Sequence, residues 1–252
     1  MDAMSEGELK LQARVVAAAR GARWLAEGWR FFRAAPLGWT ALVFGYLALM
    51  MLAWSVPVAG AAAAAVFMPS FSVSFMVVAR AASRGAPIEL PLLLEGFKLG
   101  WRTQIALGLV YLACLAAIVG ASRLFLDEMP AVDAKRPGDP GAGLAWVVAL
   151  YAPVMMMFWF APTLAAWHSA SVAKALFFSF MAFLMNWRAF LVYGLASAAV
   201  IFALAAVFAL LARLIAPEIS PAALVLPMFI AVYPTLAGSY YASYRDVFAE
   251  PS

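Results

Sequence analysis

Long apolar stretches alternate with short polar connections along most of the chain. An α-helix needs about 20 apolar residues to cross the roughly 30 Å hydrocarbon core of a bilayer. Six stretches are about this long, so the pattern predicts an all-α fold, a polytopic membrane bundle of six transmembrane helices. The six expected spans are Leu37–Val56, Val58–Ala79, Ile105–Ser122, Leu144–Trp167, Phe190–Ile215 and Ala222–Tyr244.

A seventh apolar stretch, Val172–Met185, is shorter than these six. It contains Lys174, and Trp187-Arg188 stands just beyond it. At this length an interfacial or re-entrant helix is expected rather than a span. The sequence leaves these two alternatives open.

Composition agrees with the hydrophobic pattern. The chain is 67% hydrophobic and 12% charged, whereas a soluble domain is about half apolar and a quarter charged. Its 252 residues hold six spans and their connections, with no room for a soluble catalytic domain. The first 35 residues contain no apolar run long enough for the core of a signal peptide. We divide the chain into a polar cytoplasmic N-terminus, 1–18, and a single membrane domain, 19–248.

The basic residues orient the predicted bundle. Lys and Arg accumulate in the connections that stay in the cytoplasm. The N-terminus, the second and fourth connections and the C-terminus carry 13 of the 17 basic residues, and the other connections carry 4. Both termini are therefore expected in the cytoplasm. The third connection, 123–142, holds four acidic residues and three prolines and is expected to be a solvated outer loop.

Short sequence signatures recur along the chain in the same order, which indicates an internal repeat. Glu27-Gly28-Trp29-Arg30, ahead of the first span, resembles Glu95-Gly96-Phe97-Lys98, ahead of the third. A proline followed by a hydroxyl residue recurs in the even-numbered spans, as Pro69-Ser70, Pro162-Thr163 and Pro234-Thr235. These signatures predict three units, each an interfacial amphipathic helix followed by a transmembrane hairpin, at about 19–80, 88–170 and 171–248.

Among the six expected spans, only the even-numbered ones contain prolines. A proline inside a span frees a backbone carbonyl, which must find a partner in a neighbouring helix or a nearby hydroxyl group. The even spans are therefore expected to form the inner, protein-facing layer, with the odd spans toward lipid. The residues expected to pack these helices or to line a cavity between them are Pro69, Ser70, Pro162, Thr163, Pro234 and Thr235.

The segment from Ala19 to Arg33 has the profile of a helix that lies in the headgroup plane of the membrane. Arginines recur on one face at helical spacing, and aromatic residues crowd the other. We expect this helix to dock on the membrane and to orient the first span; a lipid-sensing role is the alternative. The residues expected to contact lipid are Arg20, Arg23, Trp24, Trp29 and Arg30.

Candidate chemistry is sparse. His168 is the only histidine and Cys114 the only cysteine, so neither a metal site nor a Ser/His/Asp arrangement is expected. We interpret His168 as an interfacial aromatic position, because Phe75 and Tyr240 occupy the equivalent places in the other units. Arg213, near the end of the fifth span, is the only charge within the spans, which argues against a proton relay. We expect no enzyme activity, cofactor or nucleic-acid partner.

Two resemblances to known families follow from these features. The Trp24-Leu25-x-x-Gly28-Trp29-x-x-Phe32 opening, Pro36 and the Pro-Ser/Thr hairpins resemble a family of uncharacterised six-helix inner-membrane proteins of Gram-negative bacteria. The stretch Ala173-Lys174-Ala175-Leu176-x-x-Ser179-Phe180 followed by Asn186-Trp187 is more loosely similar to the membrane domain of glycerophosphoryl diester phosphodiesterases. The first resemblance implies a fold and an inner-membrane location. The catalytic barrel of the second family is absent, so neither resemblance implies a catalytic residue.

Two classes of function fit these features. A non-enzymatic scaffold or accessory subunit of a membrane complex is favoured, with membrane lipids and either another membrane protein or a second copy of the chain as partners. The alternative is a permease or a lipid-handling or amphiphile-handling protein, whose cavity is lined by the proline-containing helices. The space between the even spans distinguishes the two: a filled core favours the scaffold, and a lateral opening favours the alternative.

Overall fold

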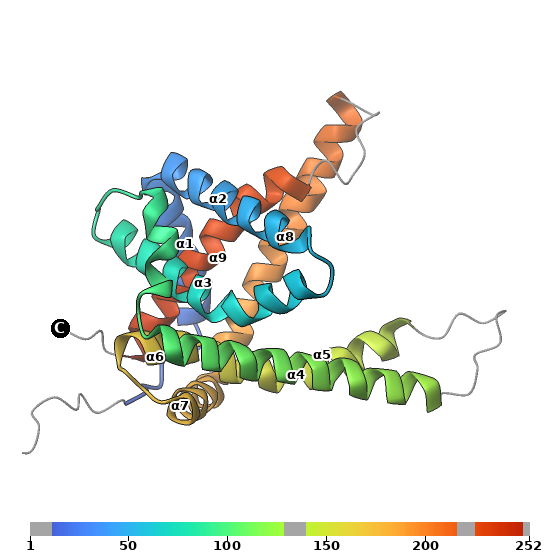
Figure 1. The fold of residues 1–252 in the computed structure, drawn as a ribbon. Coiled ribbons are helices and arrows are strands. Elements are labelled where there is room, and N and C mark those ends of the chain that lie inside the picture. Colours follow the sequence, from blue (N-terminus) through green and yellow to red (C-terminus); the bar gives the residue numbers. More distant parts are fainter. Residues whose placement is uncertain (1–11, 129–139, 216–224, 249–252) are drawn as a thin grey trace, which may run out of the picture.

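A computed structural model describes residues 12–128, 140–215 and 225–248 of the chain (Figure 1). These residues form an all-α structure of nine α-helices and one 3₁₀ helix, η1. In chain order the elements are α1 (Arg20–Ala34), α2 (Pro36–Trp54), α3 (Ala59–Ser83), η1 (Leu90–Phe97), α4 (Trp101–Glu128), α5 (Pro140–Phe158), α6 (Ala161–Trp167), α7 (Val172–Met185), α8 (Trp187–Ile215) and α9 (Val225–Val247).

Five segments of the described chain are long and apolar enough to cross a membrane, which makes this a polytopic helical membrane protein. They are Pro36–Trp54, Ala59–Ser83, Trp101–Arg123, Trp146–Trp167 and Trp187–Leu214. The sixth expected span forms α9, which is not among the five; three tyrosines and two serines stand in its last nine residues.

The connection expected at 123–142 begins later than the sequence pattern indicated. The helix α4 continues to Glu128, although its span was expected to end at Ser122. Charged residues in this last part of α4 remain helical because an α-helix can extend beyond the apolar core of the membrane. Residues 129–139, most of the expected outer loop, lie outside the described residues.

The proline-containing helices form the inner layer, as predicted from their sequences. Within the 18-residue apolar stretch that marks each span, half of the residues of α3 and 39% of those of α5–α6 are buried. The corresponding shares are 17% for α2, 17% for α4 and none for α8. Pro69, Pro162 and Pro234 are all buried within the protein. In Figure 1, α9 lies near the centre of the view, with α1, α2 and α3 around it.

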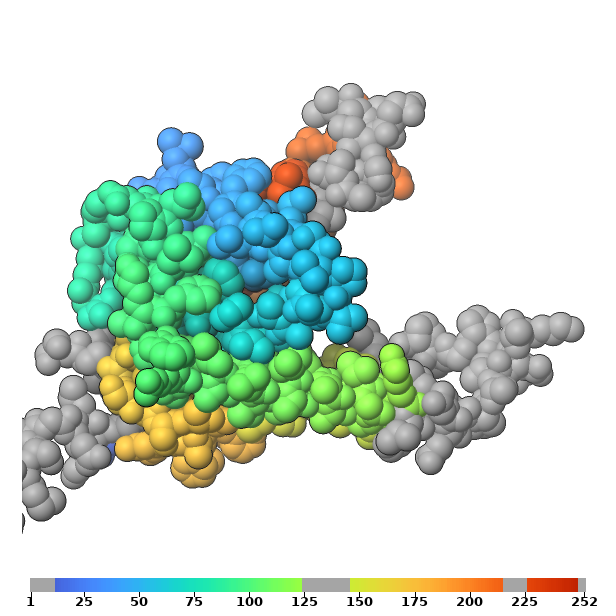
Figure 2. Space-filling model, in the orientation of Figure 1, coloured from blue at the N-terminus to red at the C-terminus, as the bar shows by residue number. Residues whose placement is uncertain are grey.

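Three short helices each pack against the second helix of a hairpin other than their own. The helix α1 packs on α9, η1 packs on α3, and α7 packs on α5 and α6. Each of these contacts joins a short helix to the hairpin that precedes it in the chain, except that α1 joins the last hairpin. In the space-filling view, α2, α3 and η1 form one mass, and α4 lies as a long ridge along its lower side (Figure 2).

Glycines allow two of these crossings to be very close. A Cβ atom added to Gly28 in α1 would lie 2.1 Å from the carbonyl oxygen of Thr235 in α9. One added to Gly96 in η1 would lie 2.0 Å from the carbonyl oxygen of Ser70 in α3. Any larger residue would therefore push the two backbones apart, and small residues are the usual means of close helix approach in membranes.

At the third crossing, of α7 with α5 and α6, a serine side chain forms hydrogen bonds with two backbone groups of the partner segment. The Ser179 hydroxyl of α7 donates to the carbonyl oxygen of Met156 over 2.9 Å and accepts from the N–H of Phe160 over 2.8 Å. In an uninterrupted helix these two backbone groups would bond to each other. A proline and an inserted side chain are both recognised causes of helix breaks, and α5 ends and α6 begins at this point, with Pro162 in the first turn of α6. The apolar stretch Val172–Met185 is thus a helix that packs its small residues against the bundle.

The two ends of the described chain meet. The backbone N–H of Arg14 donates to the carbonyl oxygen of Val247 over 2.8 Å, and that of Val16 donates to Oδ1 of Asn186 over 2.8 Å. Residues 12–18, which belong to the expected polar N-terminus, therefore pack against the C-terminal end of α9 and the junction between α7 and α8.

Candidate functional site

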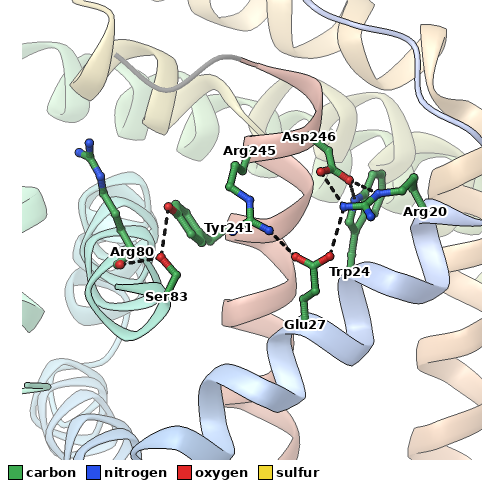
Figure 3. A network of polar contacts seen from close by, with 8 residues as sticks. All are labelled: Arg20, Trp24, Glu27, Arg80, Ser83, Tyr241, Arg245 and Asp246. Atoms are coloured by element: carbon green, nitrogen blue, oxygen red, sulfur yellow. Dashed lines mark hydrogen bonds and ion pairs between the residues drawn. The ribbon is translucent and has the colours of Figure 1, made fainter. Parts of the chain in front are cut away.

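A network of charged side chains joins α1 to the C-terminal end of α9 (Figure 3). Arg20 donates through Nη2 to Asp246 Oδ1 over 2.7 Å and lies 3.2 Å from Glu27 Oε1. Arg245 donates to the other Glu27 oxygen over 2.5 Å. The Trp24 indole N–H donates to Asp246 Oδ2 over 2.7 Å. Each carboxylate thus has at least two donors, which is the arrangement that makes partly buried charges tolerable.

The network is electrically balanced, with two arginines facing two carboxylates. The hydrogen bond to Asp246 raises the pKa of Arg20, although partial burial opposes this. Glu27 is the only acidic residue of α1, and it is buried against α9. The geometry therefore fixes the position of α1 on α9 and offers no free acid or base for chemistry.

Two of the five residues expected at the lipid boundary instead contact protein. Trp24 is completely buried, so it does not face lipid, and Arg20 is paired with Asp246 and Glu27. Arg23, Trp29 and Arg30 are exposed. Glu27 lies at helical spacing from Arg20, Arg23 and Arg30, and only the structure shows that α9 presents Arg245 to it.

Another polar contact lies beside this network. Nε2 of His168 lies 2.6 Å from the hydroxyl of Tyr244 in α9, and the Arg80 guanidinium lies over the neighbouring Trp167 ring. Burial lowers the pKa of His168. Within the described residues, no three His, Cys, Asp or Glu side chains lie close enough together to hold a metal ion.

A lateral groove of about 500 Å³ opens between α8 and α9. The helix α1 forms its third wall and holds the other two apart, because α1 packs on both: a Cβ atom on Gly21 would lie 2.1 Å from the Ala189 carbonyl of α8. The groove is lined almost entirely by apolar atoms, with Leu25 and Trp29 from α1, Val200 and Leu204 from α8 and Val232 and Thr235 from α9 among its residues. This opening lies between the fifth and sixth expected spans, and not in the space between the even spans where a lateral opening was expected to favour a lipid-handling or amphiphile-handling protein.

A smaller groove occupies the matching place in the first hairpin. It has a volume of about 340 Å³ and lies between α2 and α3, with Leu94 and Phe97 of η1 in its wall. In both places a hairpin opens beside the short helix that crosses it.

A third cavity, of about 210 Å³, lies between α4 and the inner helices α3, α5 and α9. Four hydroxyl groups reach it: Ser72 from α3, Tyr111 from α4, Tyr151 from α5 and Tyr240 from α9. The remaining walls are apolar and aromatic, including Phe158 and Trp159. We refer to this cavity as the tyrosine cleft.

The prolines predicted to pack helices or line a cavity are buried beside these sites rather than in them. Thr235 lines the lateral groove, and the Thr163 hydroxyl lies 3.3 Å from the Tyr240 hydroxyl at the edge of the tyrosine cleft. The Ser70 carbonyl lies at the crossing with Gly96. Nothing in the sequence singles out Tyr111, Tyr151 or Asp246, because their spacing does not relate them to one another.

Comparison with known proteins identifies one clear relative. Over an alignment of 256 residues the chain is 37% identical to a probable inner membrane protein of Burkholderia thailandensis, and the alignment covers 94% of each protein. No family model matches the chain, and no solved structure matches it. The resemblance to uncharacterised inner-membrane proteins is thereby confirmed. None of the comparisons supports the looser resemblance to the membrane domain of glycerophosphoryl diester phosphodiesterases.

Proposed function

Because the chain belongs to the family of the probable inner membrane protein of Burkholderia thailandensis, a family of multi-pass membrane proteins, we propose that it is a non-enzymatic protein that binds a phospholipid of the inner membrane. The acyl chain occupies the lateral groove between α8 and α9, and the anionic headgroup lies at the arginines of α1. The observation that carries this proposal is the groove itself.

The proposed topology has six spans, including α9, in three repeated units with both termini in the cytoplasm. The contact between Arg14 and Val247 supports placing both termini on one side of the membrane. The three matching crossings of α1, η1 and α7 support the repeat. The excess of basic residues in the connections on that side supports a cytoplasmic location.

The size and lining of the groove suit an acyl chain. Its volume of about 500 Å³ falls within the range of about 300–1,000 Å³ that is typical of ligand pockets. Each methylene group buried against such a surface contributes about 0.8 kcal/mol relative to water. Inside a membrane the acyl chain is already surrounded by other lipid chains, so burial in the groove adds little of this free energy. Specificity therefore has to come from the shape of the groove and from the headgroup.

Charges on α1 supply a headgroup site. Glu27 is fully engaged by Arg20 and Arg245, so the exposed Arg23, Arg30 and Arg33 leave this surface positive. The Arg33 guanidinium lies 5.9 Å from the ring centroid of Trp29, which lines the groove. A cation next to the mouth of an apolar groove matches a phospholipid with an anionic headgroup, and each basic residue near such a headgroup contributes about 1 kcal/mol.

The test is native mass spectrometry of the protein from nanodiscs that contain equal amounts of phosphatidylglycerol and phosphatidylethanolamine. We expect wild-type protein to retain phosphatidylglycerol, and Arg33→Gln to retain about fivefold less of it. Arg188→Gln is the matched control, because Arg188 also stacks on a tryptophan, Trp187, at 5.4 Å, but away from the groove. Ala196→Phe, which fills the groove, is expected to release both lipids. Equal retention of both lipids by the wild type and all three variants would refute the proposal.

An accessory subunit or scaffold is the second candidate function, and α8 is the observation that favours it. No residue of α8 from Ala198 to Leu214 is buried, and this part of the helix stands away from the other helices in Figure 1. Large apolar residues such as Phe202 and Leu210 are exposed there. Cysteine cross-linking in native membranes tests this candidate, with Phe202→Cys in a Cys114→Ala background. A specific protein adduct at Phe202 but not at Leu109, which is exposed on α4, would favour the scaffold.

A further inference from the structure

The tyrosine cleft has a hydrogen-bonding capacity that the protein itself does not use. The hydroxyl groups of Tyr111 and Tyr151 lie 2.9 Å apart and share one hydrogen bond. Two hydroxyl groups carry two protons, and a bond between them uses only one. In the parts of the chain that the structure describes, neither hydroxyl makes any other hydrogen bond. One O–H donor therefore remains for an occupant of the cleft.

The position of this donor makes it costly to leave without an acceptor. Tyr111 lies ten residues along α4 from Trp101, which at about 1.5 Å per residue is about 15 Å, half of the roughly 30 Å hydrocarbon core. Lipid chains at this depth offer no acceptor, because ester groups lie near the headgroups. A polar group that is buried in such surroundings favours any ligand that accepts its hydrogen bond.

The rest of the cleft restricts the shape and charge of that ligand. The Phe158 ring lies 5.1 Å from the Tyr111 ring, and the Trp159 ring lies 5.6 Å from the Tyr240 ring, so flat aromatic surfaces form the walls. None of the lining residues is charged. The volume of about 210 Å³ exceeds the roughly 150 Å³ of an engineered cavity that binds benzene. A substituted six-membered ring is therefore of suitable size.

We propose that the tyrosine cleft binds a neutral, planar carbonyl compound dissolved in the membrane, of the benzoquinone class, through a hydrogen bond from the Tyr111–Tyr151 pair to a carbonyl oxygen. A quinone ring provides acceptors and no donors, which complements the spare O–H. The second hydroxyl pair, Ser72 and Tyr240, has a donor–acceptor distance of 3.3 Å and lines the same cleft. This site is separate from the lateral groove and does not depend on lipid binding there.

The experiment compares two ligands that differ in the carbonyl groups: tetramethylbenzoquinone and tetramethylbenzene. Binding to the wild-type protein in nanodiscs is measured by equilibrium dialysis, and uptake by empty nanodiscs is subtracted. We expect the quinone to bind about fivefold more tightly than the hydrocarbon, the contribution of one net hydrogen bond. Equal affinity of the two ligands would overturn the proposal and would leave water or lipid chains as the occupant of the cleft.

Variants locate the effect. Tyr111→Phe and Tyr151→Phe each leave one hydroxyl group, and its O–H no longer has the other tyrosine as an acceptor. Each single variant can therefore still donate to the ligand and is expected to keep the preference for the quinone. The double variant removes both donors, and its preference is expected to disappear. Tyr46→Phe is the matched control, because the Tyr46 ring stacks on Tyr233 outside the cleft. A double variant that keeps the full preference would refute the site; if it does not fold, the wild-type comparison of the two ligands still decides the proposal.

Discussion

Replacement of Gly28 by alanine tests whether α1 is docked on α9 as described. The added Cβ atom would lie 2.1 Å from the Thr235 carbonyl oxygen and 2.6 Å from the Ser239 nitrogen. Cβ atoms essentially never approach other atoms more closely than 3.0 Å. Both obstacles belong to the α9 backbone, so no side-chain rotation relieves them. The helix α1 must move away from α9 by about 1 Å.

This movement has a calculable cost. Overpacking of this kind typically costs about 1–3 kcal/mol, and the displacement also stretches the ion pairs of Glu27 with Arg20 and Arg245. For a chain of this length, 1 kcal/mol corresponds to about 2–4 °C in Tm. We therefore expect Gly28→Ala to lower the Tm by about 2–12 °C.

The chain offers both a reporter and a control for this measurement. Cys114 is the only cysteine and is partly buried, so a thiol-reactive dye reports unfolding in detergent. Gly194 lies inside α8, where an added Cβ atom would meet no atom within 4 Å. Gly194→Ala is expected to be neutral or stabilising by up to about 1 kcal/mol, because alanine favours helix more than glycine does. If Gly28→Ala behaves like Gly194→Ala, the close crossing of α1 and α9 is wrong.

Three further predictions concern the polar contacts and the topology. Glu27→Gln is expected to cost about 1.5–3 kcal/mol, because it weakens the charged hydrogen bonds that two arginines share, whereas Glu95→Gln, at an exposed pair with Lys98, should cost less than about 0.5 kcal/mol in the same thermal assay. Burial lowers the pKa of His168 in the folded protein, so the unfolded state binds the proton more readily and stability should fall as the pH drops below about 6.5; a His168→Gln variant that keeps the full dependence would exclude this histidine as its source. A C-terminal fusion is expected to give fluorescent green fluorescent protein and inactive alkaline phosphatase, and the reverse pattern would refute a cytoplasmic C-terminus.

The sequence predicted the inner layer correctly because proline has a local backbone effect that is independent of the partner helix. Pro69, Pro162 and Pro234 each interrupt backbone hydrogen bonding, and in a membrane this restricts them to protein surroundings. The face of α1 was predicted less well. Helical spacing grouped Glu27 with the arginines, but α9 supplies Arg245 and Asp246 to that surface, and no local pattern in α1 reports them.

The residues of the tyrosine cleft could be predicted from the sequence even less well than the contacts of α1. Tyr111, Tyr151 and Tyr240 come from three helices and are at least 40 residues apart in the chain, so their hydroxyl groups are related only through helix packing. Each one alone is an ordinary aromatic residue of a membrane helix. The spare O–H donor emerges only when helix packing brings the hydroxyl groups of Tyr111 and Tyr151 together and their bonds are counted.

The sequence by itself determined that this is a multi-pass helical membrane protein, where most of its helices lie and which of them face inward, because transfer of apolar segments into lipid and the backbone chemistry of proline are local properties. The tertiary structure alone decided that α1 packs between α8 and α9, that Ser179 bonds to the backbone groups left open between α5 and α6, and that hydroxyl groups gather in the cleft. These features depend on which backbones approach within a few ångströms of each other, and that choice is made by the packing of the whole bundle.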